Sequence, residues 1–568
     1  MTQTLVTLLA LMLLPATAAA ALNLQIAGVD GELRQNVEVY IGPRTETDRM
    51  SFRALARHAD LQARDALQAL GYYHPQIDIT RSGNTCIVQI NPGPPVLIRK
   101  VDIRLEGTPE KSSPPLELTT FIAKNTPVEN DIFHHGRYET FKSNLLQQAL
   151  MRGYFNAAWV TQEARVDLDA NRADILLALR IGDRYQVGEL GITGAGIDTE
   201  LIARFPRFHA GDWYDAGQIA ELHRDLVRAG WFESVRIRAE PGDAQDQVVP
   251  VNIEYTMRKK NRVGIGLGAS TDIGPRVQLQ WEKPWLNSRG HSLNTYAEVS
   301  PVRSQVEASY LVPLTDPVTS QLAYTYGLQY EDLNDYRYWL TTAGIAHRQR
   351  LPHEWRMIRA LELEQETDDF LTFQTRTTLL MPGITLTRTE VSGAPLITRG
   401  WRLTSEIKGA ADALGSDADL LRGTIDGKAI HSLTDKTRVI ARTSMGALST
   451  PDILGIPVSQ RFFAGGDQSV RGYNYESIGP VNAAGERIGG SYLVTGSLEF
   501  DRRIAERWLV AAFVDQGSAF EDSAEFSTGV GAGVRWISLI GPLRLDFAWG
   551  VSLDKPSFNL HFYMGPEL

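Results

Sequence analysis

The last part of the sequence most constrains its fold, because polar and apolar residues alternate over about 300 residues from Arg262 onward without helical periodicity. In "WRLTSEIK", Trp401, Leu403 and Ile407 share one face, and "LAYTYGLQY" alternates in the same way. Period-two alternation predicts β-strands with one apolar face. A soluble sandwich would alternate too, but it would have to protect its edges. A closed barrel in a membrane pairs every backbone group, so we predict about sixteen antiparallel transmembrane strands over residues 259–568.

The first residues predict export of the chain. "MTQTLVTLLALMLLPATAAA" joins an apolar run to Pro15 and an alanine-rich stretch, although no lysine or arginine precedes the run. This pattern predicts a secretory signal over residues 1–20, cleaved between Ala20 and Ala21. The alternative is a transmembrane anchor, for which the apolar run is too short. Export supports the membrane-barrel interpretation over the soluble one.

Residues 21–258 contain three similar units. In each unit a helical pattern ends in a glycine that two aromatic residues follow, at roughly 80-residue intervals: Gly71-Tyr72-Tyr73, Gly153-Tyr154-Phe155 and Gly230-Trp231-Phe232. Glycine suits the left-handed position after a helix, and we expect the aromatic residues to open the next strand. One strand pattern precedes each helical pair and two follow it, so each unit is predicted to be an α+β layer of order β-α-α-β-β. The predicted boundaries are 21–96, 97–183 and 184–258.

Composition and motifs argue against several functions. The net charge of −10 does not suit a broad nucleic-acid surface. The one cysteine, Cys86, rules out an intramolecular disulfide and a paired-cysteine metal site. "HEWRM" lacks the second histidine of a zinc-protease helix, and the glycine patterns occur in strands rather than before helices. We therefore expect no enzyme activity, cofactor, metal or nucleic-acid partner.

A long glycine-rich stretch near the end, "FFAGGDQSVRGYNYESIGP", interrupts the strands. Small repeats that precede a C-terminal barrel, together with "GGDQSVRGY", resemble the outer-membrane assembly and secretion superfamily that includes BamA, whose repeats are called POTRA domains. "GSLEFDRRI" to "VDQGSAF" and "GVGAGVRWISLIGPLRLDFAWG" are similar to later motifs of that superfamily. Three repeats and the first barrel segment resemble its TamA branch, the barrel subunit of the translocation and assembly module.

The resemblance implies that this stretch folds into the barrel lumen, with Val470, Arg471, Gly472 and Tyr473 at its centre. The resemblance also implies that Asp515, in the stretch "VDQGSAF", lies on the face of its strand that points into the lumen. A guanidinium inside a barrel needs a partner, so we expect Arg471 to form a bidentate ion pair with Asp515 that anchors the loop. The alternative is an extracellular hairpin with an exposed arginine.

The resemblance further implies an outer-membrane location, periplasmic POTRA domains and assembly of unfolded outer-membrane proteins such as autotransporters. We expect a substrate strand to meet a weak seam between the first and last barrel strands. A TamB-like, inner-membrane-anchored protein that spans the periplasm is the implied partner, and outer-membrane lipid surrounds the barrel. A passive pore and a two-partner-secretion transporter remain alternatives, although the latter predicts two repeats and a plug helix. The seam residues are expected to be Gly264, Gly266, Gly268, Phe558, Leu560 and Phe562.

Overall fold

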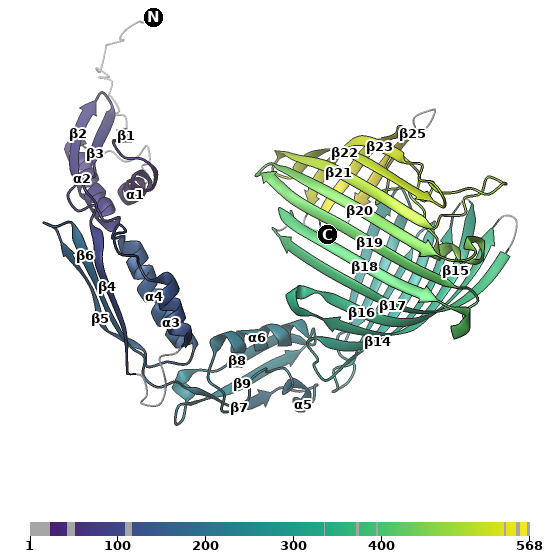
Figure 1. Cartoon of the computed structure of the whole chain (residues 1–568), viewed down its shortest axis with the longest axis horizontal. Helices are drawn as coiled ribbons and strands as arrows, with labels where there is room; N and C mark the ends of the chain where they lie inside the picture. Colours follow the sequence, from purple (N-terminus) through teal and green to yellow (C-terminus); the bar gives the residue numbers. More distant parts are fainter. Residues whose placement is uncertain are drawn as a thin grey trace, which may run out of the picture. The chain divides into compact units, whose positions relative to one another are not determined.

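The computed structural model describes residues 23–42, 51–107, 116–333, 335–370, 374–393, 396–538, 541–552 and 557–564. The predicted signal segment and its cleavage site at Ala20 and Ala21 lie outside these residues. Within the described part, no helix combines the length and the apolar character needed to cross a membrane. Three small α+β repeats are followed by one large antiparallel sheet (Figure 1), so the predicted fold class is confirmed.

Each repeat has the predicted order β-α-α-β-β. The first strand of each repeat lies beside the third, which also pairs with the second, giving the sheet orders β1-β3-β2, β4-β6-β5 and β7-β9-β8. In the first two repeats the outer pairings are parallel for β1 with β3 and β4 with β6. The elements are β1 (Asn23–Ala27), α1 (Gly31–Ile41), α2 (Phe52–Ala69), β2 (Gln76–Ser82), β3 (Thr85–Asn91), β4 (Leu97–Glu106), α3 (Leu116–Asn125), α4 (His135–Met151), β5 (Ala158–Asp167), β6 (Arg172–Arg180), β7 (Gln186–Thr193), α5 (Thr199–Ile202), α6 (Ala216–Arg228), β8 (Phe232–Arg238) and β9 (Val248–Met257).

The three glycines end the helices as predicted. Gly71, Gly153 and Gly230 have φ angles of 93°, 85° and 77°, the left-handed region that costs glycine little. The amide of Tyr72 donates to the carbonyl oxygen of Leu67 at 2.9 Å, the bond that closes a Schellman cap.

The expected role of the aromatic residues is wrong for two repeats. Strands β2 and β5 begin several residues after the aromatic pairs, and Phe232 alone opens a strand. The rings contact residues of the following repeat instead. Tyr73 hydrogen-bonds His135 at 2.6 Å, and the Phe155 ring lies 5.1 Å from that of Tyr185. Aromatic packing at these junctions therefore overrides the local strand pattern.

The repeats have apolar cores between helices and sheet. On α4, Phe141, Leu145 and Ala149 are buried, as their spacing predicts, and they pack with Leu177 of β6. Cys86 is fully buried in the first repeat's core, where it acts as a small apolar side chain.

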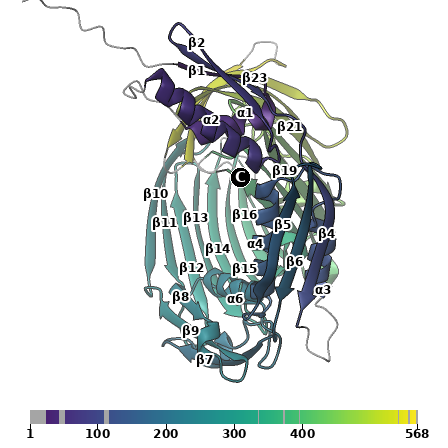
Figure 2. The same ribbon diagram turned by 90° about the vertical axis from the view of Figure 1, so that its left-hand side faces the viewer.

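Within the described residues, sixteen strands form the large sheet, and each pairs antiparallel with its neighbour in sequence. Figure 2 shows the early strands of this sheet side by side. The predicted strand number is confirmed. The strands are β10 (Arg262–Ser270), β11 (Gly274–Lys283), β12 (Ser292–Val299), β13 (Arg303–Pro313), β14 (Ser320–Asp332), β15 (Tyr336–Arg350), β16 (Arg356–Phe370), β17 (Gln374–Ser392), β18 (Arg399–Ala410), β19 (Leu420–Thr434), β20 (Thr437–Ser449), β21 (Tyr492–Ala505), β22 (Trp508–Phe520), β23 (Ser527–Ser538), β24 (Gly541–Gly550) and β25 (Ser557–Met564).

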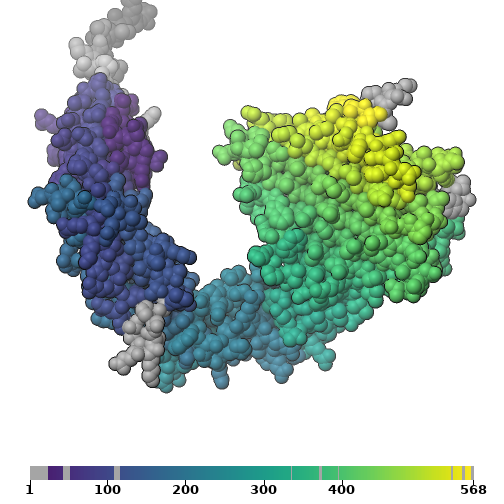
Figure 3. Space-filling model, viewed as in Figure 1, coloured from purple at the N-terminus to yellow at the C-terminus, as the bar shows by residue number. Residues whose placement is uncertain are grey.

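The wall of the barrel is apolar outside and polar inside. On β16, Leu361 and Leu363 are each 48% exposed, whereas the alternate residues Glu364 and Glu366 are 7% and 1% exposed. Figure 3 shows the green and yellow strands as a continuous wall on the face in view. Apolar side chains on the outside suit a lipid environment, and the charged residues face a lumen.

The barrel closes without a regular ladder. Cα atoms of β10 and β25 approach within 8 Å. The sheet order nevertheless begins at β10 and ends at β25, and no paired register joins the two strands within the described residues. The first and last strands therefore form a seam with unpaired backbone groups.

Candidate functional site

The glycine-rich stretch forms a folded loop over residues 450–491, between β20 and β21; we call it the lumen loop. Two short 3₁₀ turns begin it, η4 (Ile453–Gly455) and η5 (Val458–Gln460). Isolated bridges pair Phe462 with Gly490 and Ala464 with Ile478, so the loop doubles back on itself. Phe462 and Ala464 are buried against inward residues of the wall. The loop lies inside the barrel, and the extracellular-hairpin alternative is wrong.

Arg471 is the centre of the loop's attachment, with only 3% of its surface exposed. Its Nε donates to Asp515 Oδ2 at 2.7 Å and its Nη2 to Asp515 Oδ1 at 2.9 Å, which is the expected bidentate geometry. Its Nη1 also donates to Glu499 Oε2 at 2.7 Å and to Asp546 Oδ2 at 2.9 Å. One guanidinium therefore binds carboxylates from β21, β22 and β24.

Further charges complete this network, which we call the arginine network. Arg535 of β23 donates to Glu499 at 2.9 Å and also to Asp546. Arg442 lies 3.8 Å from Asp515, so the three arginines balance three carboxylates. Buried ions need such compensation, because each uncompensated charge would carry a large desolvation cost.

Sequence reasoning assigned Arg471 one acid and missed the others. Glu499, Arg535 and Asp546 lie in stretches that resemble family motifs, but the sequence patterns assigned these three residues no role. Strand alternation identifies their shared orientation: Leu498 and Phe500 are 40% and 47% exposed, which places Glu499 on the lumen face. Which inward charges contact one loop depends on the strands' register, and local patterns do not determine it.

The rest of the predicted loop motif is also buried. Gly472 has a φ of 94°, and a Cβ there would lie 2.6 Å from backbone atoms of β24. Glycine is thus required both by conformation and by close approach. Val470 is fully buried, and the hydroxyl of Tyr473 accepts a hydrogen bond from the Ser552 amide at 3.3 Å. Through these contacts the loop backbone packs against β24 and the residues that follow it.

The predicted seam residues occupy the two facing strands. A Cβ at Gly266 or Gly268 would meet the side chain of Gln278 or Arg276, so these glycines lie on the lumen face of β10. Phe558 and Leu560 on β25 are 54% and 41% exposed, toward the outside. The structure brings the two sets to neighbouring strands rather than into one cluster. Gly264 belongs to the first set and Phe562 to the second.

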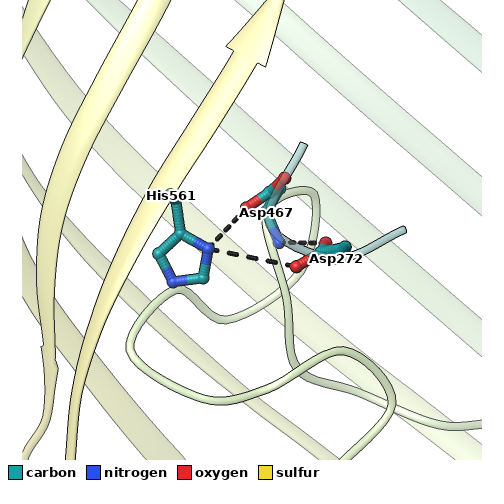
Figure 4. A group of neighbouring side chains, drawn as sticks. All are labelled: Asp272, Asp467 and His561. Atoms are coloured by element: carbon teal, nitrogen blue, oxygen red, sulfur yellow. Dashed lines mark hydrogen bonds and ion pairs between the residues drawn. The ribbon is translucent and has the colours of Figure 1, made fainter. Parts of the chain in front are cut away.

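Three residues that sequence reasoning missed meet beside this seam. Asp272 belongs to the β10–β11 hairpin, Asp467 to the lumen loop and His561 to β25 (Figure 4). One ligand-type atom of each lies within 4.8 Å of the others, a donor set that could bind a divalent cation. We refer to these residues as the seam cluster, and no sequence motif links them.

Comparison with known families identifies the barrel. A family model described as "Omp85 superfamily domain" matches residues 256–567, more than half of the chain. The chain belongs to the Omp85 superfamily. A second model, "POTRA domain TamA domain 1", matches residues 23–92 of this Omp85 protein. The resemblance seen in the sequence is thus confirmed at the level of the superfamily.

Two curated relatives are outer membrane protein assembly factors named BamA. The protein from Nitratidesulfovibrio vulgaris strain Hildenborough is 25% identical over 386 residues, covering 62% of this Omp85 chain and 47% of the relative. The protein from Neorickettsia risticii strain Illinois is 21% identical over 464 residues, covering 76% and 61%. This chain therefore spans about half to three fifths of the length of these relatives.

A solved structure supports the fold. The crystal structure of BamA from Haemophilus ducreyi lacking POTRA domains 1–3 has a TM-score of 0.66 with this Omp85 chain at 16% identity. The match covers 82% of this chain and 98% of that one. An Omp85 barrel preceded by POTRA domains resides in the outer membrane, with those domains in the periplasm.

Proposed function

We propose that this chain assembles other outer-membrane proteins, using its barrel seam as the template for an incoming strand. The observation that carries the proposal is the seam itself: β10 and β25 are neighbours, but no ladder joins them in the described residues. Unpaired N–H and C=O groups at an edge bind an extended segment by strand addition. The relatives named outer membrane protein assembly factor support this function.

The side chains around the seam fit that role. Val263, Ile265 and Leu267 on β10 are 62%, 75% and 70% exposed, and they face outward. A strand that joined this edge would place its own apolar face beside them, toward lipid. Three glycines alternate with these residues, so β10 has little lumen-side packing to lose when the seam opens.

The lumen loop argues against a permanently open pore. It lies inside the barrel and is held by the buried arginine network. The driving force for assembly in this proposal is burial and hydrogen bonding of the inserted substrate, and we propose no chemical catalysis by the chain.

We further propose that the chain acts as the TamA-type subunit of a translocation and assembly module, with autotransporters among its substrates. The match of the first repeat to a TamA domain and the three repeats support this assignment. A TamB-like protein anchored in the inner membrane would dock on the first repeat. Deleting residues 23–96 should then leave the barrel folded and abolish co-purification of that partner.

Site-specific photocrosslinking in cells tests the seam. A photoreactive amino acid at Ile265 of β10 or Leu560 of β25 should crosslink to a nascent outer-membrane protein that is stalled during assembly. The matched control is Ile345 on β15, which also faces outward with 49% of its surface exposed but lies within a paired region. Crosslinks at Ile345 as strong as those at the seam would contradict strand addition. A lack of crosslinks at all three positions, with ion conductance through the lumen, would favour the passive pore.

A further inference from the structure

The lumen loop contacts both sides of the seam. The arginine network attaches it to β21, β22 and β24, on the side where the chain ends. It also reaches the opposite side, because the backbone N–H of Asp467 donates to Asp272 Oδ2 at 2.6 Å in the first hairpin. The loop therefore spans two edges that no ladder joins in the part of the barrel that the structure describes.

Asp467 makes this connection with its side chain as well. Its Oδ1 accepts a hydrogen bond from Thr271 Oγ1 at 3.1 Å. The same oxygen is hydrogen-bonded to Nδ1 of His561 in the last strand. Asp467 is 8% exposed and His561 is 4% exposed, so water competes little for these bonds. A single carboxylate thus contacts the hairpin that follows the first strand and the middle of the last strand.

The neighbouring glycine permits this approach. Gly466 has a φ of 101°, and a Cβ there would lie 2.6 Å from Asp272 Oδ2. A larger residue would be strained at this φ and would displace the Asp272 carboxylate. The glycine therefore leaves room for the Asp272 carboxylate beside the loop.

The hydrogen bonds around His561 determine which nitrogen carries the proton. The backbone N–H of Gly472 donates to Nε2 at 3.0 Å, so Nε2 supplies a lone pair. Nδ1 of the neutral ring then carries the hydrogen and donates it to Asp467. A cation on Nδ1 would displace this hydrogen. The geometry therefore suits a hydrogen-bonded contact between Asp467, Asp272 and His561, which we call the clasp, better than a metal centre.

We propose that Asp467 fastens the seam closed by joining the first hairpin to β25, and that the seam opens for substrate when this clasp is released. The inference rests on the proposed function of the seam. It assigns Asp467, with Asp272 and His561, as positioning residues that couple movement of the lumen loop to separation of the edge strands. The arginine network holds the loop to one side only, whereas Asp467 bridges both.

Hydrogen–deuterium exchange of the purified full-length protein in detergent micelles tests the clasp. Asp467→Ala should accelerate exchange in peptides that cover β25 and β10 by about tenfold, the effect of losing one hydrogen bond to a charged group. His561→Ala and Asp272→Ala should accelerate the same peptides. Asp467→Asn keeps an oxygen acceptor and should stay near the wild-type rate. Peptides from β15 and β16 should be unchanged in every variant.

Asp426→Ala is the matched control. Asp426 lies on the lumen face of β19 and accepts a hydrogen bond from Ser444 of β20, so this bond involves neither the first hairpin nor β25. It should leave exchange at β25 unchanged. The clasp is disproved if Asp467→Ala leaves β25 unchanged, or if it accelerates β15 equally, because the effect would then be global. Slower exchange at β25 on adding zinc, or faster exchange on adding a chelator, would assign the seam cluster to a metal and also overturn the clasp.

The two proposals fail separately. Exchange reports the closed state of the seam without any substrate, whereas crosslinking reports strand addition. An intact clasp without substrate crosslinks would refute assembly at the seam, and crosslinks without a change of exchange in Asp467→Ala would refute the clasp alone.

Discussion

Strands of the repeats and of the barrel both alternate apolar and polar residues, but the repeats bury the apolar face and the barrel buries the polar one. In the second repeat, Ile175, Leu177 and Leu179 of β6 are at most 2% exposed and form the core. In the barrel, Leu361 and Leu363 of β16 face outward, and Glu364, Glu366 and Asp368 are buried. The difference shows that a strand's pattern identifies two faces, but the surrounding solvent determines which one is buried.

The consequence is two kinds of interior with different energetics. The repeat cores depend on close apolar packing, in which a lost methylene leaves a cavity. The barrel interior depends on compensated charges, in which a lost partner leaves a buried ion. Substitutions that exploit this difference should produce effects in the following order.

Arg471→Ala should have the largest effect. It leaves Asp515, Glu499 and Asp546 with fewer cations, at a cost of about 3–5 kcal/mol for a buried network. The ladder bonds of the wall remain, so we expect insertion into the membrane, a loosened lumen loop, higher ion conductance and a lower temperature for the gel-mobility shift on heating. Bilayer recordings and heat-modifiability gels measure these changes.

Two controls sharpen this prediction. Arg402→Ala removes an exposed arginine from the lumen face of β18, outside the arginine network, and should change neither measurement. Asp515→Ala should be milder than Arg471→Ala, because Glu499 and Asp546 still bind the guanidinium. A single Arg471–Asp515 pair would give equal effects, so equal effects would show that the additional carboxylates contribute nothing.

A matched pair of leucine truncations should have the next largest effect. Leu177→Ala in the second repeat should lower its stability by about 2–5 kcal/mol, because it adds a cavity to the lost transfer energy. Leu361→Ala on the outside of β16 should cost less, since lipid chains fill the space and no cavity remains. Denaturant unfolding of the repeats, followed by tryptophan fluorescence, and unfolding of the barrel in lipid vesicles compare the two. A larger loss for Leu361→Ala would refute the outward, lipid-facing assignment.

Asp225→Asn should have the smallest effect, and it tests a buried carboxylate in a repeat whose interior is otherwise apolar. Asp225 on α6 is 2% exposed, and Arg207 lies 3.8 Å away. Burial raises the pKa of Asp225 above its ordinary value, an effect that Arg207 partly offsets. As pH rises, Asp225 therefore loses its proton in the unfolded chain before it does so in the native state. The free energy of unfolding falls as pH rises from the pKa of Asp225 in the unfolded chain toward its higher pKa in the native state. The variant should lack this loss and be slightly more stable at pH 7. Denaturant melts at pH 4 and pH 7 check both points, and a less stable variant at pH 7 would show that the charge is favourable.

Much of the fold follows from local patterns. The glycines at 71, 153 and 230 predicted helix ends, because few other residues adopt their left-handed conformation. Alternation predicted a barrel of about sixteen strands, and the family resemblance implied that the face with Asp515, Leu509 and Phe513 points inward, where the structure buries it. Strand starts after the first two aromatic pairs were predicted wrongly, since the rings contact residues of the next repeat.

The sequence alone determined the order of the elements and the family, because helix endings, strand alternation and the loop motif are all local along the chain. Only the tertiary structure decided which charges meet. Asp272, Asp467 and His561 lie far apart in sequence, as do the carboxylates around Arg471. Their contacts depend on strand register and on the path of the lumen loop, and both are fixed by packing across the whole barrel.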